Sequence, residues 1–247
     1  MSRKKRYAFG YLFVLLALSC SCPQGGSRFG NLTPASPLFV DLLGNSDFPL
    51  EVCSLSRTDS TVTARYRFYS EDCLCSAGPV LFFDRSRDWD VTVNGTPMGR
   101  SVAVSGVVQE GENVIELRGS GEVPPLSLVG EFNVIRAGDG QSWIVRSAKV
   151  PAPGRLAPQG LSFYSGEVCY RRDYELTGDA GKHILRIPVW KGTSCVVQVN
   201  GVKVADVTRD RFKMDVGPYL SPGTNTLEIY ITGTDGDFGL LKDFSLE

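Results

Sequence analysis

The chain contains 247 residues, of which 42% are hydrophobic and 10% aromatic, so it has enough apolar material for more than one globular core. Its 26 basic and 27 acidic residues give a formal net charge of −1. The single histidine, His183, excludes a histidine-based metal cage and is predicted to be structural or solvent-facing.

Residues 1–19 have the features of an export signal. Residues 3–6 are all basic, and residues 11–18 form an apolar core that is too short to span a bilayer. Ala17 and Ser19 are small residues of the kind that precede a signal-peptidase cut, here before Cys20. Removal of this segment leaves 22 basic against 27 acidic residues, a formal charge of −5, which argues against nucleic acid or an anionic membrane surface as a partner.

Cys20 is placed where a bacterial lipoprotein would be acylated. Ala17 stands where lipoprotein signals usually carry Leu, so plain secretion remains an alternative, and Cys22 is a second candidate acceptor. We expect a protein of the bacterial cell envelope, periplasmic or on the outer surface, that meets the membrane only through a lipid anchor. Residues 20–37, rich in Gly, Ser and Pro, are predicted to be a flexible tether.

An internal repeat organises the rest of the chain. The sequence VTVNG at 91–95 matches VQVNG at 197–201, and GENVIEL at 111–117 matches GTNTLEI at 223–229. The two copies occur in the same order and are about one domain length apart. Asn-Gly between alternating apolar residues predicts a tight β-hairpin in each copy. We therefore expect an all-β chain with two tandem β-sandwiches of the jelly-roll, galactose-binding-like type.

Alternation with period 2 predicts the strands of both sandwiches. In the first sandwich, residues 38–136, it predicts an edge strand at 39–43 and strands at 62–69, 80–83, 90–93, 102–108, 114–118 and 132–135. In the second, residues 160–247, it predicts strands at 168–176, 183–189, 195–199, 202–207, 212–216, 226–232 and 240–246. Residues 137–159 are predicted to connect the two, with a strand only at 142–150. Trp89 is in register with Val91 and Val93, which predicts a place in the first core.

The order of motifs resembles a known family. Residues 160–170, GLSFYSGEVCY, resemble the G-x-P-F-Y-S-G-x-x-x-Y strand in the C-terminal region of glycoside hydrolase family 106, the α-L-rhamnosidase type. Ser162 occupies the usual proline position. The segment 215–225 and the closing residues 239–241 also fit, and residues 128–132 resemble a motif of the preceding domain.

This resemblance covers roughly residues 50–247. It implies galactose-binding-like sandwiches, akin to the sugar-binding domain of glycoside hydrolase family 2, and a carbohydrate setting. It does not imply hydrolysis, because the catalytic residues of that family lie in a large domain for which this chain has no room.

Sugar binding would need an exposed aromatic ring beside hydrogen-bonding side chains. Trp190 is the first candidate, because residues 185–189 alternate inward before it and so predict that its ring points outward. Trp143 in the connecting segment, and Tyr164 and Tyr219 at predicted loop positions, are further candidates. Packing between the sandwiches is the alternative role for Trp143 and Tyr164.

Cysteine pairing and metal binding leave alternatives open. Five cysteines follow the signal region: Cys53, Cys73, Cys75, Cys169 and Cys195. An odd number leaves at least one free thiol, although Cys169 with Cys195, or Cys53 with Cys73, could be bridged. Asp235, Asp237 and Asp243 could ligate a structural calcium ion, but a solvated turn is favoured, and no other cofactor is expected.

Three functions follow from these observations. The favoured one is a non-catalytic carbohydrate-binding accessory protein of the cell envelope, with Trp190 stacking on a sugar ring of a glycan polymer. The second is a structural module that docks to an envelope glycoside hydrolase or a larger complex. A stand-alone glycoside hydrolase is the least favoured, because no pair of carboxylates stands out as an acid and a base.

Overall fold

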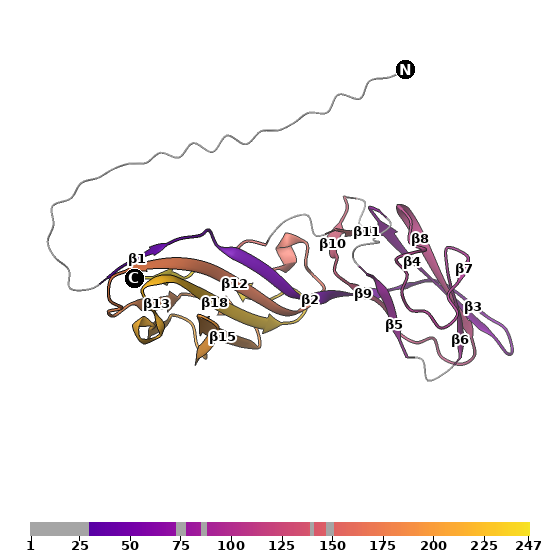
Figure 1. Ribbon diagram of the computed structural model, residues 1–247. Helices are drawn as coiled ribbons and strands as arrows, with labels where there is room; N and C mark the ends of the chain where they lie inside the picture. Colours follow the sequence, from indigo (N-terminus) through magenta and orange to yellow (C-terminus); the bar gives the residue numbers. More distant parts are fainter. Residues whose placement is uncertain (1–29, 73–77, 85–87, 139–140, 147–150) are drawn as a thin grey trace, which may run out of the picture.

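The computed structural model describes residues 30–247 with the exception of 73–77, 85–87, 139–140 and 147–150. The regular secondary structure of the described residues is almost entirely β-strand, which confirms the predicted all-β class. The chain forms two lobes joined end to end (Figure 1). Its helical turns are η1 (Ala157–Gln159) and η2 (Gly217–Tyr219), three residues each. In the part of the chain that is described, no helix has the length and apolar character needed to cross a membrane.

One lobe, the first sandwich, contains a sheet with the strand order β10-β11-β4-β8-β6-β7, with β3 beside β4. These strands are β3 (Val52–Arg57), β4 (Val62–Ser70), β6 (Trp89–Val93), β7 (Thr96–Pro97), β8 (Gly111–Gly119), β10 (Asn133–Arg136) and β11 (Ser142–Val145). All its neighbours are antiparallel except β11 and β4.

A longer sheet has the order β16-β15-β18-β12-β2-β9-β5, with β1 also paired to β12. Its strands are β1 (Asn31–Pro34), β2 (Phe39–Leu50), β5 (Val80–Phe83), β9 (Leu126–Gly130), β12 (Tyr164–Thr177), β15 (Ser194–Val199), β16 (Val202–Asp206) and β18 (Gly223–Gly233). Two small sheets, β17-β13-β20 and β14-β19, complete the other lobe, the second sandwich. They comprise β13 (Ile184–Ile187), β14 (Trp190–Lys191), β17 (Phe212–Asp215), β19 (Gly239–Leu240) and β20 (Ser245–Leu246).

Each sandwich has its own hydrophobic core. In the first, side chains of β4 and β8 such as Tyr66 and Ile115 meet those of β9 such as Leu128. Trp89, predicted to lie in this core, is partly buried and packs against it. In the second, β12, β15 and β18 contribute residues such as Ile229, which pack with Leu185 of β13 and with residues of β19. Apolar residues buried at every second position of these strands account for most of the stabilisation.

Strand β2 belongs to both sandwiches. Residues from Phe39 to Ser46 pair with β12 of the second sandwich, and residues from Ser46 to Leu50 pair with β9 of the first. Sheet pairing therefore runs without interruption from one lobe to the other. This differs from the short edge strand expected at 39–43, and β1 lies within the segment expected to be a tether.

A close approach of two glycines marks this junction. Gly44 of β2 lies opposite Gly166 of β12, and a Cβ atom on Gly44 would lie 2.4 Å from the Ser165 carbonyl oxygen. The phenol of Tyr164 crosses this bare stretch and donates to the Glu167 carbonyl oxygen at 2.9 Å. An aromatic ring that covers paired glycines restores packing that the missing side chains would have supplied.

The internal repeat has the same hydrogen-bond network in both copies. The turn residue Asn200 has a φ of 53°, its Nδ2 donates to the Asn225 Oδ1 at 3.0 Å, and its Oδ1 accepts from the Thr226 N–H at 2.9 Å. In the first copy Asn94 has a φ of 51° and makes the corresponding bonds at 2.8 and 2.9 Å, to Asn113 and Val114. Asn tolerates this left-handed backbone conformation, which is why the VNG sequence specifies the hairpin.

Several strands differ from the predicted ones. Residues 102–108 form turns and one isolated bridge, because their backbone groups bond to Pro79 and to each other. Residues 240–246 give two short strands, β19 and β20, in different sheets. The alternation did not predict β1, β3 or β9.

Candidate functional site

The candidate site is the solvent-facing side of the first sandwich, on strands β3, β4, β6, β8 and β11. We call it the outer face. Its residues are Ser54, Ser56, Thr63, Arg65, Arg67, Tyr69, Asp90, Thr92, Glu112, Val114, Glu116, Arg118 and Trp143.

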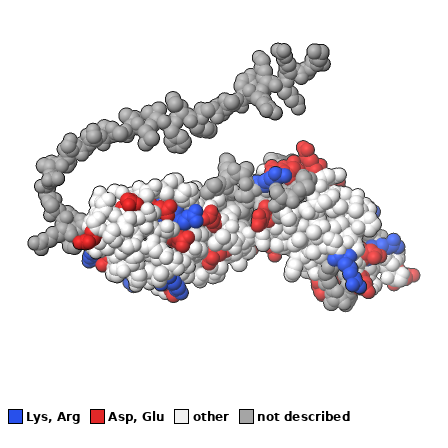
Figure 2. Space-filling model, in the orientation of Figure 1, with Lys and Arg blue, Asp and Glu red and all other residues white. Residues whose placement is uncertain are grey.

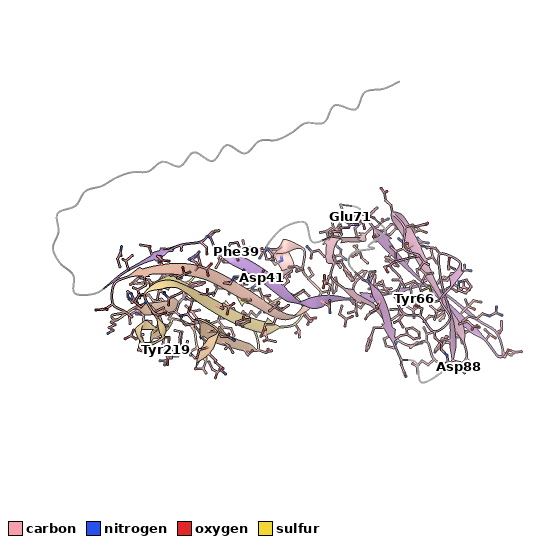
Figure 3. The ribbon with its side chains drawn as sticks, in the orientation of Figure 1. Phe39, Asp41, Tyr66, Glu71, Asp88 and Tyr219 are labelled. Atoms are coloured by element: carbon pink, nitrogen blue, oxygen red, sulfur yellow. The ribbon has the colours of Figure 1, made fainter. Side chains whose placement is uncertain are left out.

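Strict alternation in β4 creates this face. Val62, Ala64, Tyr66 and Phe68 are buried in the core, so the side chains of the intervening residues project to the other side of the sheet. Tyr66 can be seen inside this lobe in Figure 3. The β-sheet therefore holds a row of polar and aromatic groups on a rigid backbone.

Ion pairs between neighbouring strands connect the charged side chains. The Arg65 Nε donates to the Glu116 Oε2 at 2.8 Å, and the Arg67 Nε lies 3.5 Å from the Glu112 Oε1. The Glu112 carboxylate, followed by a hydrogen bond with Tyr69, raises the pKa of the Arg67 guanidinium. Both pairs are largely solvent-exposed, so they contribute little to stability and mainly orient the side chains.

Two adjoining hollows lie on the outer face, with volumes of about 520 and 400 Å³. Both are bordered by Ser54, Arg65 and Glu116, and the larger one extends across the sheet to Thr92 of β6. Hydroxyl, guanidinium and carboxylate groups thus border a single depression that crosses neighbouring strands.

An aromatic pair lies beside the ion pairs. Trp143 of β11 is in register with Tyr69 of β4, and their ring centroids are 5.3 Å apart with an angle of 30° between the ring planes. The Tyr69 hydroxyl donates to the Glu112 Oε2 at 3.3 Å. Both rings are half-buried, so they combine a fixed orientation with exposed aromatic surface.

Trp190 and Tyr164 lie in the second sandwich, where Trp190 is partly buried and Tyr164 is part of the core. Trp190 packs against the core of the second sandwich, and its indole nitrogen is buried without a partner among the described residues. The strand before it ends at Ile187, so the alternation does not continue through Pro188. Tyr164 is 2% exposed, and its ring stacks on Phe238 with centroids 5.9 Å apart.

Tyr219 is 40% exposed on η2 of the second sandwich (Figure 3). Its backbone carbonyl oxygen accepts from the Asn200 Nδ2 at 3.2 Å. Of the four predicted aromatic residues, only Trp143 belongs to the outer face, so these residues do not form a single site. The sequence analysis missed Tyr69, which contacts Trp143, and the Arg65–Glu116 pair of the same face. Alternation along 62–69 nevertheless places Arg65, Arg67 and Tyr69 on one side.

Two of the three aspartates considered for calcium, Asp237 and Asp243, are engaged by basic side chains. The Asp237 carboxylate binds Lys191 and Arg155, and the Lys191 ammonium, as the main cause, lowers its pKa. Asp243 accepts from Arg172 at 2.8 Å. No group of three potential metal ligands occurs in the described residues. His183, with 7% exposure, is buried and structural.

The structure excludes the disulfide between Cys169 and Cys195 that the sequence left open. Cys169 on β12 and Cys195 on β15 flank β18 on opposite sides, opposite the consecutive residues Tyr230 and Ile231, so their side chains face away from each other. Both thiols are free, as is Cys53. Cys20, Cys22, Cys73 and Cys75 lie outside the described residues.

The three free thiols within the described part of the chain should differ in reactivity. Burial raises the pKa of Cys169 to about 11 and that of Cys195 to about 12, whereas Cys53 is exposed beside the larger hollow. Because the thiolate is the nucleophile, iodoacetamide at about pH 8 should modify Cys53 and spare the other two in the native protein. Peptide mass mapping before and after unfolding in urea would check this, and rapid native labelling of Cys195 would contradict it.

Comparisons with known proteins give weak structural likenesses. No protein-family profile and no curated protein matches the sequence. The rhamnosidase of Novosphingobium sp. PP1Y aligns with 88% of this chain at 17% identity and a TM-score of 0.34. The Streptomyces avermitilis α-L-rhamnosidase complexed with L-rhamnose aligns with 89% at 13% identity and a TM-score of 0.33.

A third structure, the apo form of a Pleurotus ostreatus lectin, aligns with 89% of this chain and 81% of its own at 14% identity and a TM-score of 0.27. The chain spans about a quarter of the two rhamnosidases, 24% and 27%. Likenesses at these TM-scores carry no argument about the function of this chain, and the resemblance to glycoside hydrolase family 106 stays a prediction.

Proposed function

We propose that this protein is a non-catalytic glycan-binding protein and that the outer face is its binding site. The observation that carries the proposal is the Tyr69–Trp143 ring pair on the same face of the sheet as a hollow bordered by the ion pair of Arg65 with Glu116. A sugar ring has an apolar C–H face and a rim of hydroxyls. Aromatic rings pack against the apolar C–H face, and adjacent hydrogen-bond donors and acceptors bind the hydroxyls.

The carboxylates of the outer face favour binding over hydrolysis. Glycoside cleavage needs one carboxyl group that donates a proton and a second that attacks or activates water. Glu116 is held by Arg65, and Glu112 by Arg67 and Tyr69. These contacts fix the Glu112 and Glu116 carboxylates as hydrogen-bond acceptors on the outer face.

The proposed setting is the cell envelope. The basic and apolar segments of residues 1–19, followed by Cys20, support export and lipid attachment at that cysteine. An acylated Cys20 would hold the two sandwiches at the membrane through the short segment before β1. Metabolic labelling with a palmitate analogue, with a Cys20→Ser variant as the control, would test the attachment.

Replacement of Trp143 by alanine tests the binding site. A glycan array screened with residues 23–247 should identify a ligand, and the Trp143→Ala protein should bind it about 10 to 100 times more weakly because the stacking surface is lost. Tyr219→Ala removes an exposed ring from the second sandwich and should bind normally. Equal binding by Trp143→Ala and wild type, with unchanged thermal midpoints, would reject the outer face as the site.

A protein-docking role is the second candidate, and one observation favours it. Phe39 and Leu43 on β2 are 40% and 53% exposed, and the Arg171 guanidinium lies 5.5 Å from the centre of the Phe39 ring. Figure 3 shows Phe39 beside Asp41 on the surface of the second sandwich. An empty glycan array, together with a protein partner whose capture is lost in Phe39→Ala, would favour this role.

A further inference from the structure

The charges of the outer face balance. Arg65, Arg67 and Arg118 lie on neighbouring strands with Glu112, Glu116 and Asp90, three positive against three negative groups. Asp90 pairs in register with Arg118, as Arg65 does with Glu116. Basic and acidic side chains also occur in small mixed groups on the side of the molecule seen in Figure 2.

A balanced face suits an uncharged ligand. An anionic polymer would bind more tightly to a face with an excess of unpaired basic side chains, and a cationic polymer to a face with an excess of carboxylates. Paired guanidinium and carboxylate groups instead present donors and acceptors side by side at fixed spacing. Neighbouring hydroxyls of a neutral sugar can donate to one group and accept from the other.

The shape of the depression favours the interior of a polymer over its end. The two hollows share Ser54, Arg65 and Glu116, and their lining residues lie on β3, β4, β6 and β8 except for Gly95 of the hairpin turn. Four adjacent strands span about 15 Å. A depression lined by strand residues of an open sheet lets a chain continue on both sides.

We infer that the outer face binds an internal stretch of a neutral glycan polymer. This inference rests on the proposed glycan-binding function and adds the class of ligand and its mode of binding. The Glu116→Gln variant tests the charge argument, because it keeps the shape of the side chain, frees Arg65 and gives the face a positive charge. Glu228→Gln is the matched control, since Glu228 lies opposite Arg171 in the second repeat.

The experiment is affinity electrophoresis of residues 23–247 in gels that contain a neutral galactan, mannan or β-glucan, or the acidic polymer polygalacturonate. Retention by a neutral polymer is expected, with a dissociation constant that changes less than about twofold between about 0.1 and 1 M NaCl, where screening shortens from about 10 to 3 Å. Glu116→Gln should weaken this binding about fivefold or more, and Glu228→Gln should not. The monosaccharides of the bound polymer should compete only weakly.

Retention by polygalacturonate alone, lost at high salt, would overturn the inference while the glycan-binding function stands. Competition by a monosaccharide as effective as an equal mass of polymer would overturn binding to the chain interior. Absence of retention by every polymer would reject the glycan-binding function itself, and the inference with it.

Discussion

Replacement of Asn225 by alanine is expected to lower the free energy of unfolding by about 3 to 5 kcal/mol. Asn225 is 1% exposed, and its Nδ2 donates to the carbonyl oxygens of Ser221 and Gly223 at 2.7 and 2.9 Å. Its Oδ1 accepts from the Ser221 N–H at 2.9 Å and from Asn200. Alanine would leave these groups without partners in a site that water reaches poorly, and each unsatisfied group costs about 1 to 3 kcal/mol.

Urea unfolding followed by fluorescence would measure this change. Thr224→Ala is the matched control on the adjacent residue, because Thr224 is exposed and donates only to the Glu175 carboxylate. It should shift stability by less than about 0.5 kcal/mol. Asn113→Ala should repeat the large effect in the first sandwich, since Asn113 is buried and makes the same set of bonds. If both asparagine variants lowered the free energy of unfolding only slightly, the hydrogen bonds of these two side chains would not stabilise the repeat as described.

Gly44→Ala is expected to destabilise the protein by about 3 kcal/mol or more. The added methyl group would meet the Ser165 carbonyl oxygen at 2.4 Å and the Gly166 Cα at 2.9 Å, and both belong to the backbone of β12. Neither can move aside as a side-chain tip could, so β2 would have to separate from β12. The effect should reach both sandwiches because β2 is shared between them.

Gly106→Ala is the control for this substitution, because a Cβ atom there meets nothing within 4 Å. Its expected effect is within about 0.5 kcal/mol of zero. Calorimetry of the two variants side by side would show the difference in unfolding midpoint. Equal midpoints would mean that the strands at Gly44 can separate at little cost.

Local patterns predicted the parts of the fold that depend on local chemistry. The all-β class and most strands follow from period-2 alternation, and the two hairpins follow from Asn94-Gly95 and Asn200-Gly201, whose positive φ angles only a few residue types accept. The repeat also predicted that the same elements would recur. Each of these features depends on residues close together in the sequence.

The same local patterns could not predict which strands pair over long distances in the sequence. Nothing in residues 39–50 shows that half of the strand pairs with β12 and half with β9, because alternation specifies a face and not a neighbour. The outer face could not be predicted for the same reason, because the contact of Trp143 with Tyr69 depends on the long-range parallel pairing of β11 with β4. Trp190 was expected to point outward, but it packs against the core of the second sandwich. The alternation that predicted its orientation ends with β13 at Ile187, before Pro188.

The shared strand has a consequence for the order in which the protein can fold during synthesis. Phe39 and its neighbours are made early, but they pair with Arg171 and the rest of β12, which are made late. The second sandwich is therefore discontinuous along the chain, with the whole first sandwich inserted between its opening strands and its remainder. Closing so long a loop is slow, and until then the early strands expose an unpaired edge. Those early strands therefore need protection from pairing with other chains until the residues of β12 have been made.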